Sequence, residues 1–179
     1  MPVKRALTIL CGAILFVSCQ PEANEPAARV APEVVREPRD VVLYFESSKL
    51  RLEPEYRSME LPEEDYEAAR PLLQELLRGS EDSEVPRIFP DDAVVLAVYF
   101  LPRGLVVVDL GGPTLSQGWN TGSHTEMMAV YSLIQTLVSN FEGVASVRIL
   151  IGGQPAQTLA GHIAIDHFLM PNQSLVAAE

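Results

Sequence analysis

The pattern of apolar and polar positions predicts alternating strands and helices between residues 41 and 170. Residues 41–45 form a short apolar run rich in β-branched and aromatic side chains, which is typical of a buried strand. Residues 55–61 alternate polar and apolar positions, as a half-exposed strand does. Residues 62–78 place apolar side chains at helical spacing, with acidic residues at the start and Gly79 after the end, so they predict a helix.

Two strongly apolar runs follow, at residues 94–100 and 105–110. The four residues between them, Leu101-Pro102-Arg103-Gly104, have the composition of a turn, so the two runs predict a β-hairpin. Because the apolar character of both runs is continuous, we expect both faces of these strands to be largely covered.

A helix from Ser123 to Phe141 is the element that the sequence specifies most fully. Glu126 follows Ser123 by three residues, which is the spacing of a capping box, where hydroxyl and carboxylate satisfy N–H groups at the helix start. We therefore assign Glu126 to helix capping, with a general base as the alternative. The apolar side chains that recur at helical spacing predict one wide buried stripe, formed by Met127, Val130, Tyr131, Ile134, Leu137, Val138 and Phe141.

The remaining elements complete the predicted fold class. Residues 146–151 predict a strand, residues 152–155 a turn and residues 161–165 a last strand. The order β-β-α-β-β-α-β-β predicts a single α/β domain of the α+β type over residues 41–170. We expect a mixed or largely antiparallel sheet with two main helices packed on one side.

The first 18 residues have the features of an export signal. Lys4 and Arg5 precede the mostly apolar residues 6–17, a run too short to span a bilayer. Leu15-Phe16-Val17-Ser18-Cys19 resembles the lipobox of bacterial lipoproteins, which implies that residues 1–18 are a lipoprotein signal peptide. The resemblance also implies that Cys19 becomes the lipid-modified first residue, carrying acyl chains such as palmitate. The alternative is an ordinary cysteine in a signal peptide or in an uncleaved anchor.

The segment after the signal predicts a tether. Residues 19–40 comprise the lipidated Cys19 and a Pro/Glu/Ala-rich stretch with no periodic apolar face, so this stretch should stay extended. Acyl chains on Cys19 would hold the domain at a bilayer, facing the periplasm or the exterior. Gln20 is not the aspartate that retains some lipoproteins in the inner membrane, so we expect the outer membrane in a cell with two membranes. Residues 171–179 predict a C-terminal tail.

Composition excludes several classes of function. The cysteines are Cys11 and Cys19, and cleavage and lipidation would leave the mature domain with no thiol for a disulfide scaffold or a nucleophile. Losing Lys4 and Arg5 with the signal would change the formal net charge from −11 to −13. Such a surface repels nucleic acid and anionic headgroups, so we expect no nucleic-acid partner and membrane contact through acyl chains alone.

Few side chains suggest chemistry. His162 is more typical of a satisfied core histidine than of a ligand, and Asp166 and His167 should diverge on the predicted strand, which argues against a metal. Trp119, the single tryptophan, is either an interface anchor or a lid over the second helix. We expect no catalytic residue, no metal and no cofactor, and we retain Trp119, His162 and Glu126 as candidate binding residues.

Most of the folded region resembles the GerMN domain, the sporulation and spore germination module, and the carboxyl-terminal third is the more specific part of the match. The resemblance rests on Gly122-Ser123 with Glu126, Gln135-Thr136-Leu137, Gly143-Val144, Val147-Arg148-Ile149-Leu150-Ile151-Gly152-Gly153 and Gln157-Thr158-Leu159-Ala160-Gly161-His162-Ile163-Ala164-Ile165-Asp166. It implies an envelope-exposed domain, often on lipoproteins, that is not known as an enzyme fold. It also implies assembly or binding near peptidoglycan and homo-oligomers that form rings.

These observations together predict a membrane-anchored, non-catalytic envelope lipoprotein that binds a partner protein, itself or cell-wall material. One alternative is an enzyme or enzyme accessory in peptidoglycan remodelling, with Glu126 and His162 in its site. A second alternative is a periplasmic carrier of a small ligand, which would need a sizeable apolar pocket.

Overall fold

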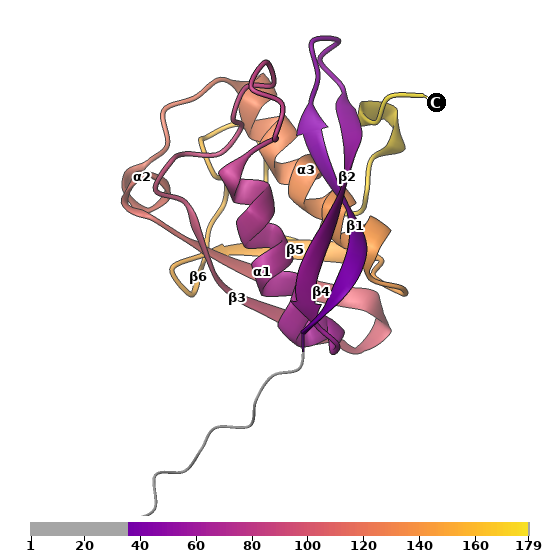
Figure 1. The fold of residues 1–179 in the computed structure, drawn as a ribbon. Coiled ribbons are helices and arrows are strands. Elements are labelled where there is room, and N and C mark those ends of the chain that lie inside the picture. The colour runs from indigo at the N-terminus through magenta and orange to yellow at the C-terminus, as the bar shows by residue number, and fades with distance from the viewer. Residues whose placement is uncertain (1–35, 179) are drawn as a thin grey trace, which may run out of the picture. The chain divides into compact units, whose positions relative to one another are not determined.

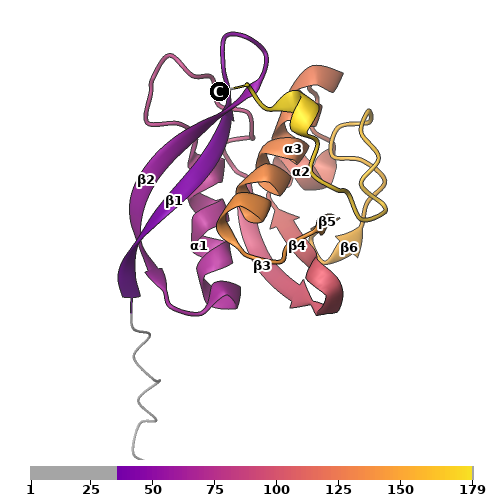
Figure 2. The same cartoon turned by 90° about the vertical axis from the view of Figure 1, so that its right-hand side faces the viewer.

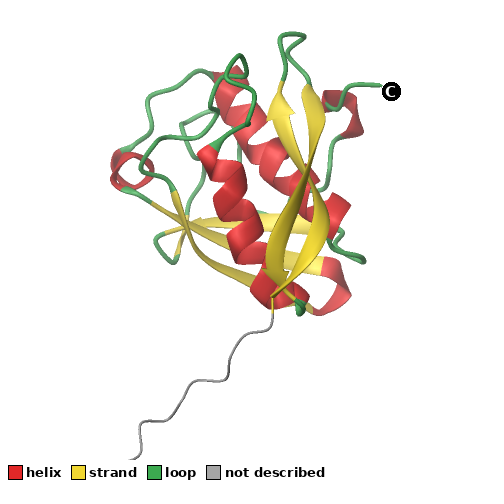
Figure 3. Cartoon of the chain, in the orientation of Figure 1, coloured by secondary structure: helices red, strands yellow, loops and turns green. Residues whose placement is uncertain are grey.

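The chain folds into a two-stranded and a four-stranded sheet with helices packed between them (Figures 1 and 3). This computed structural model describes residues 36–178, so the predicted signal peptide, Cys19 and most of the predicted tether lie outside the described residues. The mixed α/β class predicted from the sequence is confirmed. Within residues 36–178, no helix combines the length and the hydropathy that crossing a membrane requires.

Strands β1 (Arg36–Glu46) and β2 (Leu52–Pro62) form the first, antiparallel sheet, which pairs Arg36 with Pro62 and Glu46 with Leu52. Residues 36–40, which we assigned to the tether, are thus part of β1. Their proline, Pro38, is tolerated because β1 has a strand neighbour on one side only, and proline removes a ladder donor.

Helix α1 (Asp65–Arg78) follows β2, starting slightly later than the predicted Pro62. Asp65 and Glu67 lie in its first turn and Arg78 in its last, as the helix dipole favours. Its buried face contacts the core through Ala68, Ala69, Leu72, Leu73, Leu76 and Leu77.

The second sheet has the order β3-β4-β5-β6 and is mixed, as predicted. Strands β3 (Val94–Leu101) and β4 (Leu105–Gly111) form the expected antiparallel hairpin. Strand β5 (Ser146–Ile151) lies parallel to β4, and the short β6 (Gln154–Pro155) is antiparallel to β5. Two helices connect β4 to β5: α2 (Pro113–Gln117) and α3 (Ser123–Asn140).

The expected covering of both faces is wrong for β3, which is an edge strand. Val95 is buried against the helices, but Val94, Leu96, Tyr99 and Leu101 are each at least 40% exposed. Continuous apolar character could not distinguish this edge strand from a central one. In β4 the expectation holds better, because Val106, Val108, Asp109 and Leu110 are all buried.

One prediction for the carboxyl-terminal region is wrong. Residues 161–165 form a loop and not a strand, because the N–H of Ile165 donates to the carbonyl of Gln157 rather than to a neighbouring strand. Within the segment predicted as a tail, a 3₁₀ turn at Gln173–Leu175 precedes Val176, which forms a β-bridge with Leu52.

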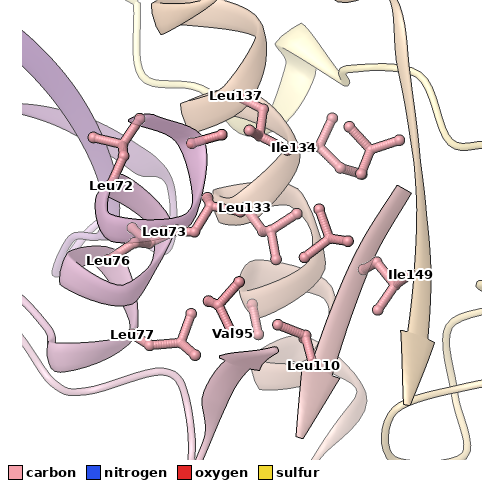
Figure 4. Packing of buried hydrophobic residues seen from close by; sticks show 14 of the residues in the cluster. Leu72, Leu73, Leu76, Leu77, Val95, Leu110, Leu133, Ile134, Leu137 and Ile149 are labelled. Atoms are coloured by element: carbon pink, nitrogen blue, oxygen red, sulfur yellow. The ribbon is translucent and has the colours of Figure 1, made fainter. Parts of the chain in front are cut away.

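The two main helices lie between the two sheets (Figure 2). Helix α1 contacts β2 and β3, and α3 contacts β1 and β5. Leucine side chains of α1 and α3 meet the inner face of the four-stranded sheet in one hydrophobic core (Figure 4). Helix α3 also faces β1 with polar groups: the Ser132 hydroxyl donates to the Tyr44 carbonyl at 2.6 Å, and the Tyr44 N–H donates to the Thr136 hydroxyl at 3.2 Å.

A buried arginine joins β2 to α1 at the side of the domain. The Arg57 side chain is 5% exposed and forms ion pairs with Glu55 and, at 2.7 Å, with Glu75. It also donates to the Gly79 carbonyl at 2.9 Å and lies 5.4 Å from the centre of the Phe45 ring. These partners compensate the guanidinium for the water that it loses on burial.

Candidate functional site

Glu126 lies at the start of α3, but not in the predicted capping box. The residue that caps the helix is Gly122, and no side-chain cap hydrogen bond forms. The N–H of Glu126 donates to the Gly122 carbonyl, so Ser123 is the first helical residue instead of the cap. The helix therefore begins one residue earlier than a capping box with Ser123 as its cap requires, and the Glu126 carboxylate is left for other contacts.

The Glu126 carboxylate is fully buried and holds a distant loop. Its Oε1 accepts from the N–H groups of Leu159 at 2.8 Å and Ala160 at 2.7 Å. Its Oε2 accepts from the N–H of His162 at 2.8 Å and lies 2.9 Å from His162 Nδ1. Because a carboxylate offers about four acceptor positions, these partners fill the Glu126 side chain.

The loop at residues 157–165 is built to surround this carboxylate. Its ends are joined by the Ile165 N–H, which donates to the Gln157 carbonyl at 2.8 Å. Leu159 and Ile165 are buried in the hydrophobic core and attach the loop to it. Gly161, at φ +99°, occupies a backbone conformation that favours glycine and lets the chain turn towards Glu126. We call residues 157–165 the Glu126 loop.

The loop therefore places His162 against Glu126. Neither the strand predicted at residues 161–165 nor the predicted capping box led us to expect this contact. A carboxylate only accepts hydrogen bonds, so His162 Nδ1 carries the proton that faces Glu126. The His162 side chain is 40% exposed, whereas that of Glu126 is completely covered. The partly exposed imidazole of His162 is thus held in place by the buried carboxylate of Glu126.

A second histidine–glutamate contact lies on the same first turn of α3. His124 Nε2 is 2.6 Å from Oε1 of Glu46, the last residue of β1, and the Glu46 side chain is 10% exposed. Sequence reasoning did not find Glu46, because the two residues lie far apart in the chain and no local pattern relates them. The amino-terminal turn of α3 is consequently joined to both β1 and the Glu126 loop.

Trp119 lies in the segment between α2 and α3. It is half-buried and packs against the hydrophobic core. Its role as a binding residue stays a prediction, as do the roles of Glu126 and His162.

Asp166 and His167 do not diverge, since residues 161–165 are not a strand. His167 Nδ1 lies 2.9 Å from Asp166 Oδ1, and both side chains are 58% exposed. The hydrogen bond from His167 lowers the pKa of Asp166, although partial burial opposes it. Among the described residues, no three metal-binding side chains of the His, Cys, Asp or Glu type come together.

The acceptor positions of the Glu126 carboxylate are all taken by groups of the Glu126 loop. A general base needs a lone pair directed at its substrate, and the four donors around Glu126 occupy those positions. A hollow of about 270 Å³ is bordered by Phe45, Glu46, Ser47, Glu53, Pro54, Glu55, Ser80, Asp82 and Val85. A larger one, of about 440 Å³, is bordered mostly by polar residues, namely Tyr56, Arg57, Ser58, Met59, Glu60, Glu75 and Glu81, whereas pockets for small ligands are mostly apolar.

Comparison with known proteins establishes the class of this chain. The family model called Germane, described as sporulation and spore germination, matches residues 42–157. The two sheets and the helices between them, together with this match, define an α/β domain of the sporulation and spore germination type. The chain belongs to the Germane family. No curated protein matches the chain.

Solved structures share this fold at low sequence identity. A protein from Clostridium perfringens described as a candidate lipoprotein is 20% identical, with a TM-score of 0.54 over 78% of this chain and 93% of that one. The first GerMN domain of the sporulation protein GerM from Bacillus subtilis is 20% identical, with a TM-score of 0.52 over 73% of this chain and 97% of that domain. The tandem GerMN domains of GerM are 15% identical, with a TM-score of 0.56 over 86% of this chain and 51% of that chain. This chain therefore corresponds to a single GerMN domain.

Proposed function

We propose that this chain is a lipid-anchored envelope lipoprotein whose GerMN-type domain is a non-catalytic binding module for a partner protein, a second copy or cell-wall material. The observation that carries the proposal is the saturation of Glu126, the acid best placed to act as a base. Its four hydrogen-bond partners are all groups of the Glu126 loop. A carboxylate used in this way stabilises a surface loop and has no free position for a substrate proton.

The membrane anchor is supported by two independent features. The lipobox-like residues end at Cys19 and are followed by the proline-rich stretch, and a protein of the same fold from Clostridium perfringens is described as a candidate lipoprotein. More than one acyl chain is needed for stable anchoring, which lipidation of an amino-terminal cysteine would supply.

The non-catalytic role is tested with the double variant Glu126→Gln, His162→Gln. We expect it to melt at lower temperature and to leave cell-wall turnover unchanged in cells grown well below that temperature. Glu142→Gln, an exposed substitution just beyond the end of α3, is the control for the lost charge. Wall turnover that falls while the double variant is still folded would support the rival proposal of a peptidoglycan enzyme.

The anchor is tested separately with Cys19→Ala. We expect the unsubstituted chain in the membrane fraction, labelled by a fatty acid, and the variant unlabelled and no longer stably bound. A variant that still partitions fully into membranes would contradict lipidation at Cys19. Crosslinking of the anchored protein in living cells, followed by mass spectrometry, would then identify the partner.

A further inference from the structure

The turn between β1 and β2 holds a leucine in a backbone conformation that is unusual for this residue. Leu50 has φ +58°, a left-handed region that is an outlier for a bulky side chain. The Leu50 N–H donates to the Ser47 carbonyl at 2.9 Å, and the Ser47 N–H donates to the Arg51 carbonyl at 2.8 Å. These bonds define a hairpin loop of three residues, whose left-handed position glycine occupies without steric cost.

Packing within the domain does not explain the leucine. Leu50 is 59% exposed and lies outside the hydrophobic core. A leucine at this position therefore costs backbone strain and also leaves an apolar side chain in water. Strained conformations of this kind are concentrated at functional and ligand-binding sites. The position of Leu50 thus points to a contact outside the domain.

Two cationic side chains flank Leu50. Lys49 and Arg51 are both exposed, and Lys49 is the sole lysine after Cys19 in a chain rich in acidic residues. Residues 47–51, which we call the hairpin tip, contain no aspartate or glutamate. The tip therefore combines one exposed apolar side chain with two positive charges.

The acidic residues nearest to the tip in the sequence leave these charges available. The carboxylate of Glu46 lies 2.6 Å from His124 Nε2, and the Glu46 side chain is only 10% exposed. Glu53 lies 3.3 Å from Lys49 Nζ, but this pair is at the surface, where the Lys49 side chain is 76% exposed. Such an exposed pair contributes little and exchanges readily for another anionic partner.

The hairpin tip protrudes from one end of the domain. Figure 1 shows the turn between β1 and β2 beyond the ends of the helices, whereas Arg36, where the described chain begins, lies at the opposite end. At about 3.3 Å per residue, the length of β1 separates Arg36 from the tip by roughly 33 Å. The chain between Cys19 and Arg36 could span at most about 55 Å if fully extended. One bilayer can therefore hold acyl chains on Cys19 and also touch the tip.

We propose that the hairpin tip inserts into the surface of the bilayer that holds Cys19, with Leu50 at the acyl chains and Lys49 and Arg51 at anionic headgroups. The inference rests on the proposed lipid anchor and adds a second contact, made by the folded domain itself. Leucine beside lysine or arginine is typical of segments that lie in a membrane interface. The long basic side chains can place their charges at headgroups while their stems lie on apolar surface.

The small size of the tip favours a lipid surface over a protein as its partner. A stable protein interface buries about 800 Å² on each side and needs a complementary surface, whereas a bilayer adapts to a single protruding side chain. The acyl chains would also supply this bilayer at high effective concentration, so that a weak second contact is sufficient.

The negative net charge of the chain is compatible with this contact. It led us to expect membrane contact through acyl chains alone, but charges farther than about 10 Å from a surface are largely screened at physiological salt. Lysine and arginine close to an anionic bilayer are attracted to it. Insertion of the protruding tip would thus hold the acidic body of the domain away from the headgroups and give the domain a fixed orientation.

The experiment places an environment-sensitive dye on the tip of the full-length, acylated chain. Ser48→Cys supplies the thiol, because no cysteine follows Cys19. The chain is reconstituted in vesicles of equal parts of phosphatidylcholine and phosphatidylglycerol. We expect the emission to shift to shorter wavelength relative to the same dye at Ser58→Cys, an exposed position near the other end of the hairpin. Identical emission from the two positions would overturn the proposal.

Leu50→Gly separates insertion from folding. We expect it to lower the ratio of inserted to free tip at least about tenfold, because it removes the apolar side chain. The same substitution should raise the melting temperature without lipid, because glycine relieves the strain at φ +58°. Tyr56→Ala, which removes an apolar side chain that is 76% exposed on β2, is the control and should leave insertion unchanged. Insertion that Leu50→Gly leaves unchanged would overturn the proposal.

The two cations are tested with the double variant Lys49→Gln, Arg51→Gln. We expect it to reduce the shift on the mixed vesicles, and we expect the unsubstituted tip to shift less on phosphatidylcholine alone. A shift of equal size on both kinds of vesicle would overturn the assignment of Lys49 and Arg51 to anionic headgroups.

Two further readouts separate the possible failures. A shift that is absent on lipid vesicles but present on membranes isolated from cells would overturn the lipid surface in favour of a membrane protein. Mass spectrometry of the same sample measures acylation of Cys19. An acylated chain with a solvated tip would overturn the tip contact alone, whereas an unacylated Cys19 would contradict the proposed anchor itself.

Discussion

Asn140 and Val42 exchange two hydrogen bonds, as two residues of neighbouring strands would. The Val42 N–H donates to Asn140 Oδ1 at 3.0 Å, and Asn140 Nδ2 donates to the Val42 carbonyl at 2.7 Å. Together with Ser132 and Thr136, which bond Tyr44, Asn140 forms a row of polar side chains on α3 at intervals of four residues. This row covers the edge of β1 that β2 leaves open, so a helix takes the place of a strand.

We predict that Asn140→Leu lowers the free energy of unfolding by about 2 kcal/mol, because it leaves a donor and an acceptor of Val42 without partners. Ser139→Ala, on the exposed side of the same helical turn, removes only two long hydrogen bonds of 3.3 Å, from Gln135 and to the Tyr44 hydroxyl, and should cost less, about 1 kcal/mol. Denaturant unfolding monitored by circular dichroism measures both. Equal effects of the two substitutions would contradict the strand-like role of Asn140.

The Glu126 loop gives a second prediction. Glu126→Gln should speed hydrogen exchange at the amides of Leu159, Ala160 and His162, since the new NH₂ group faces backbone donors instead of accepting from them. We expect a loss of about 2–3 kcal/mol in local or global stability. Glu142→Gln controls for the lost charge. Unchanged protection at these three amides would show that the carboxylate does not hold the loop.

Glu55 predicts how stability depends on pH. Burial raises the pKa of Glu55, but hydrogen bonds from the Ser80 hydroxyl, the Arg57 guanidinium and the Glu81 N–H outweigh burial and hold the pKa below its ordinary value. A carboxyl group with a lowered pKa stabilises the folded state above its unfolded pKa, about 4.3, and loses this effect as the pH falls through the folded pKa.

The stability difference between the unsubstituted chain and Glu55→Gln should therefore be largest near neutral pH and shrink below about pH 4.3. Urea titrations at a series of pH values measure it. Glu53→Gln, on the same strand but paired with Lys49 at the surface, controls for the loss of one negative charge from β2. A difference that grows on acidification would contradict the stated direction of the shift.

Gly104 provides a steric prediction. It lies at the end of the β3–β4 turn with φ +72°, and a Cβ there would overlap the carbonyl oxygen of Gly143. We expect Gly104→Ala to cost more than about 3 kcal/mol, a size typical of overpacking combined with backbone strain.

Gly118→Ala is the matched control for Gly104→Ala. Gly118 also has a positive φ, +107°, but no atom lies within 4 Å of its added Cβ. It should cost about 1–2 kcal/mol, from the left-handed backbone alone. Thermal melts of the two variants compare them, and equal losses would exclude a close contact between Gly104 and Gly143.

The sequence predicted the elements whose pattern is local. Helix α3 and strand β5 were recognised because apolar spacing and a following glycine turn, Gly143 or Gly152, depend on neighbouring residues alone. Strand β1 was predicted too short because Pro38 is typical of a tether. Only its place beside β2, with α3 on the other edge, makes a proline acceptable there.

The candidate site was predicted in its residues but not in its arrangement. Glu126 and His162 were both singled out, yet their contact depends on a loop that the alternation of Ile163 and Ile165 had suggested was a strand. Ile165 is buried, as in a strand, but it is fixed by the Gln157 carbonyl instead of by a sheet. The local sequence pattern did not indicate Glu46 as a site residue, because its partner, His124, follows much later in the chain.

The parallel pairing of β4 with β5 has a consequence for synthesis. Both hairpins, β1–β2 and β3–β4, join segments that emerge from the ribosome one after the other. Strand β4 instead waits for its second neighbour until α2, α3 and residues 146–151 have been made. Until then an apolar strand has an unfilled edge in the nascent chain, and such delayed, non-local pairing slows folding and invites aggregation.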